Sequence, residues 1–207
     1  MNARTLCAPL ASALLVALTT LAAPGAFAQN VPVVSGNATI STGAGSDTTG
    51  ALSVNEAAGL DNAQSNQLAL GMGATGAGYV GVTQLAVTHA RVGDTATRIE
   101  GTAFSNVSGA LMVNQSAGAG NLQRNSIVLG TLGAEARAVS DTELSETAPR
   151  PGGPGLPVGG RGMPEASISG DAFKHISGIV QVNQTSGAGN ATANSFVLRP
   201  PAGTLFN

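Results

Sequence analysis

The side chains that could perform acid–base or metal chemistry are few and lie far apart. His89 and His175 are the two histidines of the chain, and each stands outside any cluster of His, Cys or carboxylate residues with a metal-ligand spacing. Serine is abundant, but no Gly-x-Ser-x-Gly sequence occurs at a strand-to-helix turn, where such a serine becomes a nucleophile. We therefore predict no catalytic, metal or cofactor site, and we predict that the protein is not an enzyme.

Closely spaced glycines, which can form phosphate-binding loops, occur at Gly118/Gly120 and at Gly187/Gly189. A P-loop also requires a Lys followed by Ser or Thr at the start of a helix. In this chain an Asn and an apolar strand pattern follow each pair. Because Gly and Asn tolerate positive φ angles, these pairs instead predict turns.

The first 28 residues are predicted to be a signal peptide. Arg4 precedes an apolar run from Leu10 to Ala23, and Ala26-Phe27-Ala28 is a small-x-small cleavage pattern that places Gln29 first in the mature chain. The run is too short for a confident membrane span, so we expect no stable membrane insertion after its removal. The only cysteine, Cys7, lies in this segment. We expect export through the periplasm to the cell surface or the extracellular space.

The composition is unusual for a globular protein. Aromatic residues make up 3% and charged residues 10% of the chain, and glycine accounts for 29 of 207 residues. Large aromatic side chains usually contribute much of a core, so an ordinary enzyme core is difficult to build from this chain. The net charge of -2 provides no basic stripe, which argues against a nucleic-acid partner. Backbone hydrogen bonds and ladders of small residues can still order such a chain in a stacked β structure.

Three segments with one pattern, 40–70, 99–129 and 168–198, align without a gap. The second and third share roughly 17 of about 31 residues, and such self-similarity identifies a repeat array in which each unit packs on the next. The other predicted segments are a signal peptide (1–28), an N-terminal segment (29–39), a linker with short strands (71–98), a linker (130–167) with a Pro/Gly-rich loop (148–164), and a C-terminal tail (199–207).

The pattern of each repeat predicts a strand, a turn and a second strand, which together form a β-arch. In the second repeat Leu111 and Val113 alternate with Met112, the period of two expected for a half-buried strand. This strand is expected to end at the Asn-Gln pair 114–115 and at the equivalent pairs of the other repeats. The predicted turn glycines are Gly59, Gly118, Gly120, Gly187 and Gly189.

A single arch cannot bury its apolar face, because an isolated two-stranded unit is marginal in water. Stacked at about 4.8 Å, each arch pairs its backbone with its neighbours and aligns identical side chains, so that amides in register form ladders. The predicted fold is therefore all-β, a short β-solenoid or stacked β-arch repeat array with irregular linkers. The predicted ladder residues are Asn55, Asn62, Asn66, Asn114, Gln115, Asn121, Asn125, Asn183, Gln184, Asn190 and Asn194.

The charged residues inside the repeats include Glu56, Asp61, Arg124 and Lys174. The simplest interpretation is a solvated face. The alternative is gatekeeping, in which charges that differ between repeats slow or end the stacking, and Glu56 and Asp61 are the candidate gatekeepers.

The linkers also contain short patterns. Tyr79–Val82 and Leu85–Thr88 predict short β segments, and Ala134–Glu143 is compatible with a strand or a weak helix. The run Ala148–Pro164, rich in Pro and Gly, predicts a flexible or polyproline-like loop.

An apolar strand that enters Val-Asn-Gln, followed by Gly-x-Gly-Asn and then Asn-Ser with a second apolar strand, resembles the repeat of Fap-type functional amyloid proteins of bacterial biofilms. The spacing of Gln115, Gly118, Gly120 and Asn121 is more distantly similar to the curlin repeat. The resemblance implies export through an outer-membrane secretion machinery and β-fibre formation, with self-association or other amyloid subunits as partners.

Two departures from the Fap pattern bear on the role in such a fibre. The fibre subunits of the family carry a Cys-x-x-Cys near the C-terminus, which this chain lacks. The first repeat has Gly45 where the other two have Phe, and Glu56 where they have Gln. We therefore expect a minor subunit, nucleator or assembly component rather than the major subunit. The alternative function is a surface adhesin or β-helical binding module.

Overall fold

The computed structural model describes residues 32–71, 83–86, 88, 90–130 and 162–198. Within these ranges the chain forms β-strands and no helix, so no helix that could span a membrane is found there. The strands are β1 (Val33–Ile40), β2 (Thr49–Leu60), β3 (Ala63–Gly71), β4 (Arg91–Ile99), β5 (Ser108–Ala119), β6 (Leu122–Gly130), β7 (Pro164–Ile168), β8 (Ser177–Ala188) and β9 (Ala191–Leu198).

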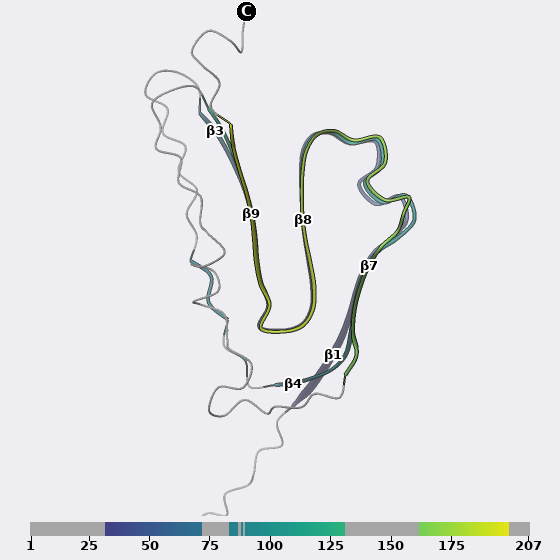
Figure 1. Ribbon diagram of the computed structural model, residues 1–207, viewed down its shortest axis with the longest axis vertical. Helices are drawn as coiled ribbons and strands as arrows, with labels where there is room; N and C mark the ends of the chain where they lie inside the picture. The colour runs from purple at the N-terminus through teal and green to yellow at the C-terminus, as the bar shows by residue number, and fades with distance from the viewer. Residues whose placement is uncertain (1–31, 72–82, 87, 89, 131–161, 199–207) are drawn as a thin grey trace, which may run out of the picture. The chain divides into compact units, whose positions relative to one another are not determined.

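The strands build three parallel sheets, ordered β1-β4-β7, β2-β5-β8 and β3-β6-β9. Each sheet takes one strand from each of three successive lengths of chain, which we call the first rung (33–71), the second rung (91–130) and the third rung (164–198). The rungs overlie one another in Figure 1, with β8 between β7 and β9. The predicted all-β repeat stack is confirmed.

Equivalent residues of the repeats pair directly with one another. Asn55 is opposite Asn114 and Asn114 is opposite Asn183, and the pairing of β2, β5 and β8 continues without a shift along their whole length. The same holds for β3, β6 and β9. Parallel in-register pairing places like side chains in columns that run across the rungs.

Each rung contains a third strand in addition to the two that the repeat pattern predicts. β1 lies almost wholly in the predicted N-terminal segment, β4 in the first predicted linker, and β7 begins at Pro164, the last residue of the predicted Pro/Gly-rich loop. These strands cover the face of the central sheet that a two-stranded arch would leave open. Contacts between β1 and β5, and between β4 and β5, form this second layer.

The central strand β5 is buried on both faces. Leu111 and Val113 pack with Ile99 in the main apolar cluster, whereas Met112 and Asn114 are buried on the alternate face. The predicted half-buried strand is therefore wrong for the second rung, because sheets lie on both sides of β5 and rungs lie above and below it.

An aromatic column fills the bend before the central sheet. Phe104 is 1% exposed and stacks on Phe173 with ring centroids 5.3 Å apart. Gly45 holds the same place in the first rung, and a Cβ atom there would lie 2.7 Å from the Phe104 ring. The first-rung glycine thus makes room for the aromatic ring of the second rung.

The first strand of each repeat is longer than its sequence pattern predicts. β2 continues past Asn55 and Glu56 to Leu60, and β5 and β8 continue equally far. The predicted strand ends at the Asn-Glu and Asn-Gln pairs are therefore wrong, because the backbone bends while its pairing to the neighbouring rung persists.

The described residues include only part of the two predicted linkers. The described residues of the predicted strand Leu85–Thr88 are not in a strand, so that prediction is wrong; Ala86 instead packs on Leu122. Tyr79–Val82, Ala134–Glu143 and His89 lie outside the described residues, as do the predicted signal peptide with Cys7, residues 148–161 of the Pro/Gly-rich loop, and the tail.

Candidate functional site: amide columns between open edges

The first amide column consists of Asn55, Asn114 and Asn183. Asn114 donates from Nδ2 to Asn55 Oδ1 at 2.9 Å, and Asn183 donates to Asn114 Oδ1 at 2.9 Å. The same nitrogens also donate to backbone carbonyls of the β3-β6-β9 sheet, at Ser65 (3.0 Å) and Arg124 (2.9 Å). Since only nitrogen can donate to a carbonyl, these contacts determine the orientation of each amide.

The second column faces the first from the neighbouring sheet. Asn125 donates to Asn66 Oδ1 at 2.9 Å, and Asn194 donates to Asn125 Oδ1 at 3.0 Å. Their nitrogens also reach the carbonyls of Val113 (3.0 Å) and Val182 (3.1 Å) in the central sheet. The two columns therefore join the central sheet to the β3-β6-β9 sheet through amides.

The third column lies at the turn between the central strand and the last strand of each rung. Asn62 Oδ1 accepts from both the backbone N–H (3.0 Å) and Nδ2 (2.8 Å) of Asn121. Asn121 Oδ1 accepts in the same way from Asn190, at 3.1 Å and 2.8 Å. Two donors on one oxygen hold each turn in register with the next.

The turn glycines keep the rungs close together. Gly59, Gly118 and Gly187 have φ values of 115°, 119° and 110° and remain paired in their strands, so the chain bends there without losing its ladder. A Cβ atom on Gly118 would lie 1.9 Å from the Gly187 carbonyl oxygen. Gly120 and Gly189, with φ of 68° and 66°, begin the turn itself.

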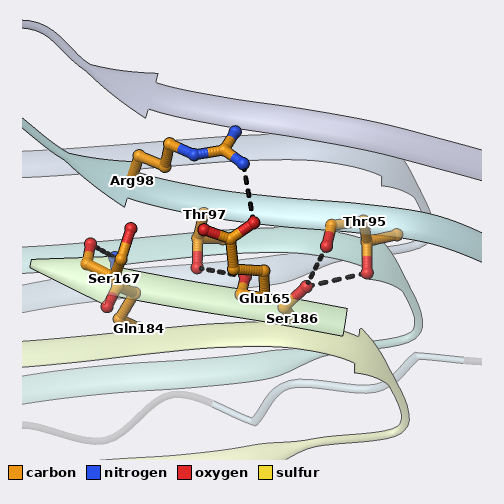
Figure 2. A network of polar contacts seen from close by, with 7 residues as sticks. All are labelled: Thr95, Thr97, Arg98, Glu165, Ser167, Gln184 and Ser186. Carbon is orange, nitrogen blue, oxygen red and sulfur yellow. Dashed lines mark hydrogen bonds and ion pairs between the residues drawn. The ribbon is translucent and has the colours of Figure 1, made fainter. Parts of the chain in front are cut away.

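The fourth column, Glu56, Gln115 and Gln184, points to the opposite sheet. Gln184 donates to Gln115 Oε1 (2.9 Å) and to the Ser167 carbonyl (2.9 Å), a contact visible in Figure 2. Gln115 donates to Glu56 Oε2 (2.8 Å) and to the Arg98 carbonyl (2.8 Å). This column joins the central sheet to the β1-β4-β7 sheet.

Other polar contacts support the same sheet junction. Figure 2 shows Ser186 of β8 beside Thr95 of β4, where the Ser186 hydroxyl donates to the Thr95 carbonyl at 3.0 Å. Arg98 and Glu165 form an ion pair at 2.7 Å with side chains 35% and 55% exposed. At that exposure the pair stabilises by about 0–1 kcal/mol, so the packed contacts matter more than the charges.

All four columns have the same polarity. In each, the amide nitrogen of one rung donates to the side-chain oxygen of the preceding rung. Buried donors and acceptors that are satisfied in this way rigidify a polar interior. In the three asparagine columns the first rung therefore has no preceding rung whose oxygens could accept from its amide nitrogens. In all four columns the third rung has no following rung whose nitrogens could donate to its side-chain oxygens.

The two candidate gatekeepers and Arg124 have different surroundings. Glu56 is partly buried and also accepts from the Thr39 backbone N–H at 2.8 Å, whereas Asp61 is exposed and adopts φ of 53° in its turn. Arg124 is 1% exposed and donates to Gln67 Oε1 at 2.6 Å, so a solvated face is the wrong interpretation for Arg124. Gatekeeping stays a prediction at this point.

The bend of the third rung carries Lys174 and Asp171. Exposed Lys174 donates a hydrogen bond to Asp171, and this contact lowers the pKa of the Asp171 carboxyl. His175 stands in a column with Asn106 and Asp47, where Asn106 donates to Asp47 at 3.0 Å. The described residues contain no group of three or more His, Cys, Asp or Glu placed to hold a metal ion.

The repeat pattern misses the strands of the β1-β4-β7 sheet. One signal could have found them, because Ile40, Ile99 and Ile168 pair in register, and small residues stand shortly before each of them, at 38–39, 95–97 and 166–167. Alternation at Thr95, Ala96 and Thr97 is equally typical of a strand.

In-register parallel strands with continuous amide columns define the class of amyloid-type β-stacks. The family model of the Functional amyloid protein FapB/FapC family matches residues 20–201, and the chain belongs to this family. The resemblance to Fap-type proteins is therefore confirmed, and the family is one of structural amyloid proteins rather than enzymes. No solved structure matches the chain.

Proposed function

We propose that the protein is a structural component of an extracellular amyloid-type fibre or biofilm matrix and acts by stacking its rungs on those of other subunits. The observation that supports this proposal is that every sheet has an open edge strand on each side. β1, β2 and β3 are edge strands on the first rung, and β7, β8 and β9 are edge strands on the third. Such edges present unpaired backbone groups that another chain can complete.

We further propose a minor role in that fibre, as a nucleator, minor subunit or assembly component. Two first-rung differences support this role, namely Gly45 in the aromatic column and Glu56 in the glutamine column. A chain whose two end rungs differ is suited to starting or ending a stack. Export by the predicted signal peptide, through the periplasm and an outer-membrane secretion machinery, would bring it to the cell surface.

Fibre formation by the purified mature chain tests the function. We expect aggregates that resist detergent and give cross-β diffraction with spacings of about 4.8 Å and about 10 Å. A stable soluble monomer that binds a ligand saturably would contradict this proposal and favour the adhesin or binding module instead.

A further inference from the structure

We propose that copies of this chain join head to tail, with the third rung of one copy against the first rung of the next, and that Glu56 caps the first rung and weakens this junction. The inference rests on the proposed function, because it specifies how the stacking occurs. The partner is a second copy of this chain.

The polarity of the amide columns determines the direction of stacking. Within the chain, each rung donates amide hydrogens to the rung before it. In the three asparagine columns the first rung therefore presents amide nitrogens at its open edge, and the third rung presents amide oxygens. A head-to-tail junction continues the three asparagine columns, pairing Asn55, Asn62 and Asn66 of one copy with the third-rung oxygens of another. A head-to-head junction would bring donor edges together.

The bend before the central sheet provides a second match. Asn106 of the second rung donates to Asp47 of the first at 3.0 Å, and His175 occupies the same column in the third rung. Head-to-tail stacking places the His175 imidazole, which carries an N–H donor, next to the Asp47 carboxylate of the following copy. The pair that meets at the junction is therefore complementary, as the pair inside the chain is.

The glutamine column is the mismatch. In the third rung Gln184 uses its nitrogen on Gln115 Oε1 and on the Ser167 carbonyl, so its oxygen is the atom that faces the next copy. The residue that meets this oxygen is Glu56, whose ionised carboxylate has no hydrogen to donate. Two acceptors would then face each other at the junction, whereas inside the chain a donor and an acceptor join each pair of neighbouring rungs in this column.

Glu56 also occupies a backbone donor that a stacked rung would use. The Ile40 carbonyl accepts from the Glu100 N–H at 2.9 Å, so Ile40 faces β4. Successive residues of a strand direct their backbone groups to opposite sides, which places the N–H of Thr39 at the open edge of the sheet. The Glu56 carboxylate accepts that N–H at 2.8 Å. The first-rung edge is therefore partly closed by its own side chain.

Repulsion between the Glu56 side chains of successive copies is not the cause of the weakening. A head-to-tail stack repeats Glu56 only every third rung, which is about 14 Å at a rung spacing of about 4.8 Å. That separation exceeds the screening length of about 8 Å at physiological salt. The effect is local, and a single neutral substitution should remove it.

Disulfide trapping tests the direction of stacking. We would prepare Asp47→Cys and His175→Cys separately in the mature chain, mix them, let fibres grow under reducing conditions and then oxidise them. Adjacent rungs lie within the Cα separation of a disulfide, at most about 6.8 Å, whereas positions two rungs apart, at about 9.6 Å, do not. We expect dimers that contain one chain of each variant.

Asn106→Cys provides the matched control, because it lies in the same column but in the second rung. Mixed with either end variant, it should give no interchain disulfide in a head-to-tail fibre. Fibres that form but contain no mixed end-variant dimer, or that contain Asp47→Cys homodimers, would overturn the inference while leaving the proposed function intact. A mature chain that forms no fibres at all contradicts the proposed function itself.

Seeded growth tests the role of Glu56. Glu56→Gln restores a donor to the junction and releases the Thr39 N–H, so we expect elongation about tenfold faster, the ratio that corresponds to about 1.4 kcal/mol. Glu100→Gln makes the same chemical change in the second rung, away from both open edges, and should leave the rate unchanged. Growth of the Glu56→Gln chain at the unaltered rate or below it, measured by thioflavin fluorescence at equal seed concentration, would reject the capping role.

Discussion

At the scale of single residues, this protein replaces much of an aromatic core with paired amides. Asn114 is fully buried, and its oxygen accepts from Asn125 (3.0 Å) and Asn183 (2.9 Å) while its nitrogen donates to the β3-β6-β9 sheet. A buried amide of this kind stabilises only while all its partners are present, because an unsatisfied polar group in the interior is costly.

Substitution of the central asparagine should therefore be far more damaging than substitution at the end of its column. We expect Asn114→Ala to lower the free energy of unfolding by about 2–3 kcal/mol, because it leaves neighbouring amide donors and acceptors buried without a hydrogen-bond partner. Asn55→Ala, at an exposed position of the same column, should cost less than half as much. Guanidinium unfolding followed by circular dichroism measures both, and equal midpoint shifts would contradict the ladder role.

At the scale of the strands, close approach of backbones determines which residues are allowed. The bends at Gly59, Gly118 and Gly187 lie directly over one another, and the second-rung bend lies between two neighbours. Positive φ favours glycine at all three bends. Only Gly59 and Gly118 also lack space for a Cβ atom, because the backbone of the following rung lies against them.

Gly118→Ala should consequently break the register of the central sheet. Its Cβ atom would lie 1.9 Å from the Gly187 carbonyl oxygen, and the residue would keep a φ of 119°. We expect a loss of more than about 2 kcal/mol in the free energy of unfolding, from steric overlap and backbone strain together. Gly170→Ala is the control, since a Cβ atom there meets nothing within 4 Å. Similar unfolding midpoints for the two variants would show that the bend tolerates a wider spacing.

At the scale of the whole molecule, the second rung is the interior and the other two are its surfaces. Leu111, Gln115 and Asn125 are fully buried in the second rung, whereas Asn55 and Leu198 on the end rungs are exposed. A stack of a few rungs is stable in proportion to the interfaces between them, so its ends are its weakest part.

Hydrogen exchange should detect the difference in protection between the second rung and the two end rungs, and the loss of this difference on assembly. In the monomer we expect the amides of β5 to exchange most slowly, because edge strands leave alternate backbone groups unpaired. In fibres β2 and β8 should approach the protection of β5, since each then has a rung on both sides. Persistent fast exchange of β2 and β8 in fibres, measured by mass spectrometry after dissolution, would mean that the edges are not the contact surfaces.

The amino-acid sequence by itself determined the repeat and its register. Identical residues recur at equivalent places. A parallel stack in register is stabilised by this recurrence, because Asn114 pairs best with another asparagine in the preceding and in the following rung. The turn positions followed from glycine and asparagine at fixed offsets. These features depend on side-chain identity, so they are legible in the sequence.

Only the tertiary structure decided which other segments complete each rung and how deeply the middle rung is buried. The strands β1, β4 and β7 differ in sequence, because parallel pairing uses backbone hydrogen bonds that many sequences can make. The burial of Arg124 and the bond from Thr39 to Glu56 likewise depend on neighbours from distant parts of the chain. Local pattern carries no information about such neighbours, since their contacts exist only once the rungs have stacked.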